Sequence, residues 1–161
     1  MIENSIKCLC GSDEHYALCC QPFHQNTKNP LTAALLMRSR FTAYAMKNEE
    51  YLLQTWDISK RPKEINFAKE TAEWTKLEIL KTKKGEEKDS KGIVEFKAYY
   101  TQDNQDYVMS EISRFKKTAG RWVYLDGIVK SVIKAGQETN QGKNAPCSCG
   151  SGKKYKRCCG K

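Results

Sequence analysis

The middle of the chain, over residues 28–132, changes from a helical to a strand-like pattern of apolar positions. Apolar side chains first recur every three to four residues, which predicts a helix over 32–47 with Thr32 as its N-cap. Asn48 and the two acidic residues after it predict a second short helix, because acidic side chains favour the positive end of a helix. Pro62 predicts a third short helical turn.

The later part of this region alternates apolar and polar residues, as strands with one buried face do. The pattern predicts strands over 74–81, 92–100, 107–117 and 121–129, separated by polar or glycine-containing turns. Helices followed by antiparallel strands are typical of an α+β fold. We therefore expect a central α+β domain over 28–132, with the helices packed on the sheet and a pocket between them.

One predicted strand carries a carboxylate on an otherwise mostly apolar face. Glu111 shares that face with Met109, Ser113 and Phe115. A buried carboxylate without a partner is very costly, so a cation or hydroxyl is expected nearby. The candidate cations are Arg38, Arg40 and Arg114. We expect a structural ion pair that supports the fold, with a small polar cavity as the alternative. The predicted lining of that cavity is Arg38, Tyr99, Glu111 and Asp126.

Composition indicates a globular protein with a strongly basic C-terminal end. The chain has 161 residues, 39% hydrophobic and 29% charged, which fits one globular domain with small appendages. No apolar run approaches the ~18–20 residues that span a bilayer, and residues 1–7 lack the pattern of a secretory signal. We expect a cytoplasmic protein with no membrane segment. The net charge is +9, and residues 141–161 hold six basic side chains and no acid, which favours an anionic partner.

All eight cysteines lie in two blocks that repeat the same spacing, C-x-C-x8-C-C. Seven of thirteen positions are identical between the blocks, including a glycine, a serine and a tyrosine. Four thiolates at such spacing are typical of a structural zinc site, with Zn–S near ~2.3 Å. We expect two zinc ions, one in each block, and the predicted ligands are Cys8, Cys10, Cys19, Cys20, Cys147, Cys149, Cys158 and Cys159.

Zinc would also explain how such short segments fold. Thirteen residues cannot bury enough apolar surface alone, and metal binding contributes ~10–16 kcal/mol in small zinc peptides. Gly11 and Gly150 permit a tight turn after the first cysteine pair, and Tyr16 and Tyr155 are expected to pack over the metal.

Other cysteine chemistries stay open as alternatives. Disulfides need an oxidising compartment, whereas an iron–sulfur cluster or a redox-active thiol pair needs only the same residues. His15 and His24 lie in or beside the first block, but four thiols already complete a site. We expect both histidines to be surface or supporting residues rather than ligands.

Both cysteine blocks resemble the SEC-C motif, a zinc knuckle found at the C-terminus of the SecA translocation ATPase. The second block, PCSCGSGKKYKRCCG over residues 146–160, is especially similar. Leu9 and Ser148 replace the proline often found between the first two cysteines, and Cys159 stands where SecA often has histidine.

The whole chain resembles the YchJ family of uncharacterised bacterial proteins. The resemblance implies an N-terminal knuckle over 1–24 and a C-terminal knuckle over 146–161. It also implies a cystatin-like, nuclear-transport-factor-like cone as the central domain, and no established activity. The stretches that carry it are 36–41 (LMRSRF), Thr55-Trp56, 111–115 (EISRF) and 122–127 (WVYLDG). The polar, glycine-containing composition before the second knuckle predicts a linker over 133–145.

The sequence contains no metalloprotease, nucleophile-elbow, phosphate-loop or dinucleotide motif. We therefore expect a non-catalytic adaptor whose basic C-terminal knuckle docks on a ribosome, another nucleic acid or an acidic protein. The alternatives are a small-molecule binder or enzyme that uses the central cavity, and a zinc or redox sensor. The residues expected to contact the partner are Lys153, Lys154, Lys156 and Arg157.

Overall fold

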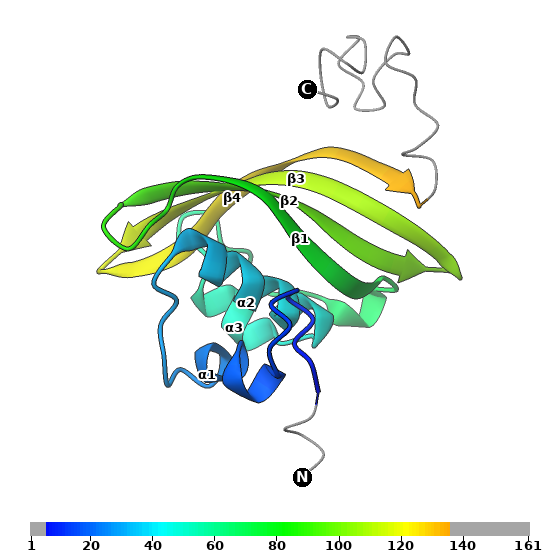
Figure 1. Cartoon of the computed structure of the whole chain (residues 1–161), viewed down its shortest axis with the longest axis horizontal. Helices are drawn as coiled ribbons and strands as arrows, with labels where there is room; N and C mark the ends of the chain where they lie inside the picture. The colour runs from blue at the N-terminus through cyan, green and yellow to red at the C-terminus, as the bar shows by residue number, and fades with distance from the viewer. Residues whose placement is uncertain (1–5, 136–161) are drawn as a thin grey trace, which may run out of the picture.

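Four long antiparallel strands form a single sheet in the order β1-β2-β3-β4. The computed structural model describes residues 6–135, and Figure 1 shows the sheet curving over the helices. Sequential strands are neighbours because short turns join them. The strands are β1 (Glu73–Lys84), β2 (Lys91–Gln102), β3 (Gln105–Thr118) and β4 (Arg121–Lys134).

The helices precede the sheet, so the predicted α+β fold is confirmed. Thr32 caps α2 by accepting a hydrogen bond from Leu35 N at 3.1 Å, and Asn48 caps α3 by accepting one from Tyr51 N at 3.1 Å. Both predicted caps are confirmed. The turn predicted at Pro62 is wrong, because the short turn forms after Asn66, whose side chain accepts from Ala68 N. The elements are α1 (Gln21–His24), α2 (Ala33–Ala45), α3 (Glu49–Gln54) and the 3₁₀ turns Tyr16–Leu18 and Phe67–Lys69.

The main core lies between α2 and the concave face of the sheet. Leu36 and Phe41 from α2 meet Val94, Phe96 and Phe115 from the two central strands, and all five are almost completely buried. Burying a side chain of this size contributes about 1.5–3 kcal/mol. This contact fixes α2 against the sheet and thereby places every residue that α2 presents to its other neighbours.

Helix α2 is buried on more than the one face that its apolar pattern predicts. Ser39, Arg40 and Thr42 are buried as well as the apolar residues. The residues around the N-terminal cysteines cover one of the remaining sides, and α3 covers another. The polar side chains of α2 therefore act as contacts between parts of the molecule rather than as a solvated face.

A bulge in β1 changes which residues face the core. Thr75 has no opposite residue in the register with β2, while Trp74 pairs with Tyr100 and Lys76 pairs with Tyr99. The extra residue puts Trp74 on the core side, where its ring lies edge-on to Phe41 at 6.2 Å. A regular alternation that places Leu77 on the core side would put Trp74 on the opposite face.

The sheet also extends beyond the predicted strand ends. Strand β4 runs to Lys134, so the segment predicted as a linker from residue 133 begins inside the sheet. The rest of that linker and the predicted C-terminal knuckle lie outside the described residues. Within residues 6–135, no helix is both long enough and apolar enough to span a bilayer.

Candidate metal centre and central cavity

The four N-terminal cysteines come together in one cluster. The sulfurs of Cys8, Cys10, Cys19 and Cys20 all lie within 4.8 Å of one another. The Sγ atoms of Cys10 and Cys19 are 3.5 Å apart, and those of Cys19 and Cys20 are 3.9 Å apart. Four sulfurs bound to one zinc at ~2.3 Å would be about 3.8 Å apart, whereas a disulfide needs ~2.05 Å. The cluster therefore has the dimensions of a tetrathiolate metal site.

Short-range backbone hydrogen bonds bring the two cysteine pairs together. Cys8 N donates to Glu14 O and Tyr16 N donates to Ile6 O, both at 2.8 Å, which folds the first pair back on the segment before the second. Gly11 makes the tight turn with a φ of 86°, a value that favours glycine. The predicted roles of Gly11 in the turn and of Tyr16 as a packing residue are confirmed.

The thiols of this cluster differ in their readiness to lose a proton. Hydrogen bonds from the thiols of Cys20 and Cys8 lower the pKa of Cys10 far below its ordinary value. The pKa of Cys20 is correspondingly raised, because its proton is held by Cys10 and Cys8. Burial raises the pKa of Cys19 to about 11. One negative charge therefore forms readily at Cys10, and a bound cation would be needed to remove the remaining protons.

The cysteine cluster is attached to the α+β domain at several points. Arg38 Nη1 donates to Cys10 O at 2.6 Å, and the Thr42 hydroxyl lies 3.5 Å from Cys8 Sγ. A Cβ on Gly11 would lie 2.6 Å from Leu77 O of β1, so only glycine permits this close approach. The cluster is consequently fixed between α2 and β1.

His24 connects the cluster to the domain and is not a ligand. Its Nε2 lies 2.8 Å from Ser39 O, which can only accept, so Nε2 carries the proton and donates. Its Nδ1 then accepts from the Tyr16 hydroxyl at 2.8 Å. Burial lowers the pKa of His24, which keeps the ring neutral. Both nitrogens are occupied by protein groups, and His15 is exposed and outside the cluster, as expected for both.

A second feature of the domain is a cavity of about 250 Å³ between α2 and the sheet. Apolar side chains form most of its wall, while five polar residues approach it from α2 and from strands β3 and β4. Its lining is Met37, Arg40, Phe41, Tyr44, Trp74, Phe96, Ala98, Met109, Glu111, Ser113 and Tyr124.

Glu111 is the carboxyl group of this cavity, as predicted. Ser113 Oγ donates to Glu111 Oε1 at 3.2 Å, and burial raises the pKa of the carboxyl. Gly127 makes room for it, because a Cβ there would lie 2.2 Å from Glu111 Oε1 and 2.9 Å from the Tyr124 hydroxyl. Within residues 6–135, no ion pair involves Glu111, so the expected structural ion pair is not what the structure shows.

Arg40, rather than Arg38, supplies the positive charge beside the cavity. Its Nη1 donates to Leu52 O and to Thr55 Oγ1, both at 2.8 Å. Its guanidinium carbon lies 4.6 Å from the ring centre of Tyr124. Arg38 is two residues earlier on α2, roughly 200° around the helix, and so faces the cysteine cluster instead.

The other two predicted cavity residues also lie elsewhere. Tyr99 points away from the core face and lies beneath Lys76, whose Nζ is 5.1 Å from its ring centre. Asp126 accepts from Arg114 Nε at 2.6 Å on the outer side of the sheet. A register shift between Arg114 and Phe115 leaves Leu125 as an extra residue, which moves Asp126 off the face that Tyr124 occupies.

The predicted C-terminal site lies outside the described residues. This applies to its four cysteines and to the basic residues expected to contact a partner. Those residues are Cys147, Cys149, Cys158, Cys159, Lys153, Lys154, Lys156 and Arg157.

Two family models match this chain. One, described as the middle NTF2-like domain of YchJ, matches residues 32–127, and another, the SEC-C motif, matches residues 144–161. The SEC-C match covers the C-terminal cysteine block. The N-terminal block has the same cysteine spacing and forms the cluster described above.

Relatives match over almost the whole length. A UPF0225 protein of Vibrio cholerae is 39% identical over 158 residues, covering 96% of this chain and 100% of the relative. A UPF0225 protein of Photorhabdus laumondii is 42% identical over 159 residues, covering 95% and 98% of the two chains.

Solved structures of similar proteins share the fold. A SEC-C motif containing protein from Psychrobacter arcticus is 28% identical with a TM-score of 0.66, covering 99% of this chain and 98% of its own. The solution structure of RPA3114 from Rhodopseudomonas palustris, also a SEC-C motif containing protein, is 31% identical with a TM-score of 0.68. It covers 76% of this chain and 98% of its own. The chain therefore belongs to the YchJ family of UPF0225 proteins, with an NTF2-like middle domain and a C-terminal SEC-C motif.

Proposed function

We propose that this protein is a zinc-binding adaptor without catalytic activity. One zinc ion holds the N-terminal block on the domain, and a second organises the basic C-terminal block, which docks on an anionic partner. The observation that supports the first ion is the meeting of four thiols within 4.8 Å. Such a set of soft ligands suits zinc and leaves no open position for a substrate.

The surroundings of the N-terminal cluster support a structural rather than a redox role. Cys10, whose pKa is lowered, is buried together with Cys8 and Cys20, and burial raises the pKa of the half-buried Cys19 to about 11. A redox-sensing thiol needs an accessible thiolate, so this environment disfavours that alternative. The contacts of Arg38 and Thr42 with the cluster fix its geometry, as outer contacts do in structural metal sites.

Metal content tests this assignment directly. Elemental analysis of gently purified full-length protein should find two zinc ions per chain, and the double variant Cys10→Ser/Cys20→Ser should retain one. The matched variant Cys149→Ser/Cys159→Ser should also retain one. Iron in place of zinc, or unchanged zinc content in either variant, would contradict the proposal.

The division of roles between the two ends follows from charge. The turn of the N-terminal block carries Asp13 and Glu14, and its other side is occupied by α2 and β1. That block is therefore a structural cap with little surface for an anionic partner. The C-terminal block carries four cations among its cysteines, namely Lys153, Lys154, Lys156 and Arg157.

A co-sedimentation experiment tests the adaptor role. Wild-type protein should migrate with ribosomes or RNA in a gradient at low salt and dissociate steeply as salt rises. Replacing all four of these cations by alanine should abolish the association, whereas Asp13→Ala should leave it intact. Equal migration of wild type and the four-cation variant would remove the proposal.

The central cavity supports a second candidate function, binding of a small molecule with an apolar body and one polar end. The observation that favours it is a largely apolar hollow ending at Glu111, Ser113 and Tyr124. A thermal-shift screen of small amphipathic compounds should yield a ligand whose stabilisation is reduced in Glu111→Gln and kept in Glu78→Gln on β1. Equal stabilisation of both variants by every ligand found would exclude this site.

A further inference from the structure

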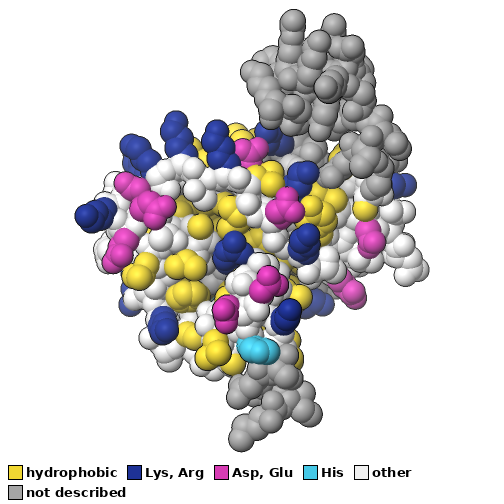
Figure 2. Space-filling view, viewed as in Figure 1, with side chains coloured by type: hydrophobic (Ala, Val, Ile, Leu, Met, Phe, Trp, Pro, Cys, Tyr) yellow, Lys and Arg dark blue, Asp and Glu magenta, His cyan; other side chains and the backbone are white. Residues whose placement is uncertain are grey.

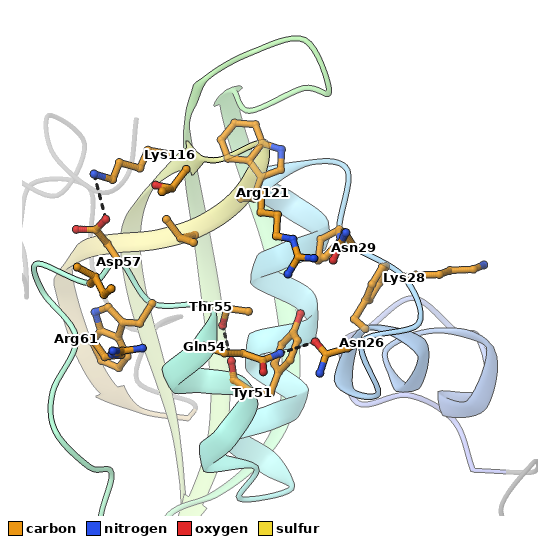
Figure 3. Close-up of a pocket in the computed structure, with 17 residues that line it drawn as sticks. Asn26, Lys28, Asn29, Tyr51, Gln54, Thr55, Asp57, Arg61, Lys116 and Arg121 are labelled. Atoms are coloured by element: carbon orange, nitrogen blue, oxygen red, sulfur yellow. Dashed lines mark hydrogen bonds and ion pairs between the residues drawn. The ribbon is translucent and has the colours of Figure 1, made fainter.

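A second hollow, which shares no lining residue with the central cavity, carries four cations on its wall. Its volume is about 560 Å³, which lies within the ~300–1,000 Å³ typical of small-ligand sites. It is formed by the segment after α1, the end of α3 with the loop that follows, and the ends of β3 and β4 (Figure 3). Four basic residues and one acidic residue line it, namely Lys28, Arg61, Lys116, Arg121 and Asp57.

The single acid is already neutralised by one of these cations. Lys116 Nζ lies 3.0 Å from Asp57 Oδ1, and the Asp57 side chain is only 8% exposed. Hydrogen bonds from Ser59 and then from Lys116 lower the pKa of Asp57, so it is ionised at neutral pH. Asp57 and Lys116 thus form a neutral pair in the wall of the hollow.

The other three cations have no compensating charge. In the described part of the chain, no side-chain hydrogen bond or ion pair engages Lys28, Arg61 or Arg121. Figure 3 shows Arg61 on the same side of the hollow as Asp57, and Arg121 on the side of Asn29, while the end of Lys28 extends outward. On the face shown in Figure 2, by contrast, basic side chains are interspersed with acidic ones.

The floor of the hollow strengthens the field of these charges. Tyr51 and Trp122 line it and are only 2% and 3% exposed. Their rings therefore form a wall of low dielectric constant and are too buried for a ligand to stack on them. Charges of one sign around a concave wall of low dielectric concentrate counter-ions. Recognition here would therefore depend on charge and hydrogen bonding, with Asn29 and Thr118 as neutral polar neighbours.

We propose that this hollow binds a phosphate-bearing ligand with at least two negative charges. Arginine side chains match phosphate oxygens in a two-pronged geometry, and Arg61 and Arg121 approach from separate segments of the chain. The volume exceeds that of one phosphate group, which favours a diphosphate or a phosphate ester. Such chemistry is found both in free phosphorylated metabolites and in nucleic acids.

Titration calorimetry of the full-length protein with inorganic pyrophosphate tests the site. The double variant Arg61→Gln/Arg121→Gln should lose about tenfold or more in affinity, because both charge-assisted contacts disappear. The variant Lys81→Gln/Lys83→Gln changes the net charge equally on the exposed part of β1 and should bind as wild type does. Asp57→Asn should bind severalfold more tightly, because it removes the one acidic side chain among the described residues of the wall and releases Lys116.

The opposite directions of these changes separate a specific site from general attraction to a basic protein. Equal affinity of the two double variants, or absence of pyrophosphate binding by wild type, would overturn the proposal. The arginine variants remove no side-chain hydrogen bond found within residues 6–135, and unchanged melting temperatures will verify that they fold.

A competition experiment distinguishes the two sources of phosphate. A 5′-phosphorylated RNA oligonucleotide that is displaced by pyrophosphate, and weakened by Arg61→Gln/Arg121→Gln, would place nucleic acid in the hollow. RNA that stays bound at saturating pyrophosphate and is lost only on replacing Lys153, Lys154, Lys156 and Arg157 would assign the hollow to a free phosphorylated compound. That second outcome would support the proposed role of the C-terminal block independently.

Discussion

The N-terminal block and the helix–sheet unit achieve order by different physical means. The block, over residues 6–24, has a core made of Cys8, Cys10 and Cys20 with Tyr16 beside them. The helix–sheet unit instead has a continuous apolar core of ten buried side chains from α2 and all four strands. The first region is too small for apolar burial alone to hold it, whereas the second buries a continuous apolar core.

Their junction shows how the two are combined. The block makes an apolar contact with the helices through Phe23, which packs on a cluster formed by Ala43, Tyr51 and Leu52. Its orientation is fixed by the hydrogen bond from Arg38 to Cys10 O and by the ring of His24 between Tyr16 and Ser39. Directional polar contacts of this kind fix orientation with modest energy. The comparison implies that the two regions can lose their order separately.

Loss of the proposed zinc ion from the N-terminal block should have the largest effect of all. Since zinc contributes ~10–16 kcal/mol to the folding of small zinc peptides, the Cys10→Ser/Cys20→Ser variant should lose the block's structure. Hydrogen exchange should show rapid exchange at the Cys8 and Tyr16 amides, which now donate to Glu14 and Ile6. Amides paired between β2 and β3 should stay protected, and equal loss of protection in both regions would break the comparison.

A cavity in the apolar core should have the opposite pattern: it should destabilise the helix–sheet unit, whether or not metal is present. Phe115 is 2% exposed, so Phe115→Ala should lower the free energy of unfolding by about 3–5 kcal/mol. The loss should be the same with and without chelator, as measured by denaturant unfolding. Ile128→Ala, at a side chain 72% exposed, is the control and should cost less than about 0.5 kcal/mol.

The sequence predicted those parts of the fold that local patterns determine. Thr32 and Asn48 were identifiable because N-caps act within three residues, and the alternation along β2 and β3 follows one unbroken pleat. The faces of Trp74 and Asp126 were not, because single extra residues at Thr75 and Leu125 shift the alternation. Such bulges depend on pairing with a neighbouring strand, which one strand's pattern does not contain.

The two sites differ in predictability for a related reason. The cysteine cluster was evident because the spacing of soft ligands within thirteen residues is itself the signal. Predicting the cavity lining requires knowledge of which side of α2 packs on the sheet. That side carries Arg40, whereas Arg38 points to the cysteine cluster. The hollow lined by four cations joins three regions distant in sequence, 23–30, 51–61 and 116–123, and no local pattern marks it.

Weakening the contact between the N-terminal block and α2 should loosen the block without unfolding the helix–sheet unit. Arg38→Ala removes the hydrogen bond to Cys10 O, and for a half-buried charged donor the expected cost is about 1–2 kcal/mol. The Cys8 amide should exchange faster while the denaturation midpoint of the sheet barely moves. Lys88→Ala, in the turn between β1 and β2, should change neither quantity. A large drop in global stability would show that the block and the sheet form one cooperative unit.

The smallest effect should come from Glu111 and should depend on pH. Burial raises the pKa of Glu111 above its ordinary 4.5, so above that pH the unfolded chain loses this proton before the folded one does. The folded state then binds more protons, and stability falls as pH rises until the folded pKa is reached.

Glu111→Gln should remove this decline in stability. From pH 4.5 upward, the free energy of unfolding of the variant should therefore rise relative to that of wild type by at most about 1.4 kcal/mol per pH unit. Denaturant unfolding at a series of pH values, with Glu73→Gln on the exposed end of β1 as control, measures the difference. The hydrogen-exchange rate of the Cys8 amide should be the same in the variant and in wild type, because the Glu111 carboxyl lies in the central cavity and not at the cysteine cluster. A constant difference across the series would mean that Glu111 is ionised in the folded protein throughout, with Arg40 compensating its charge.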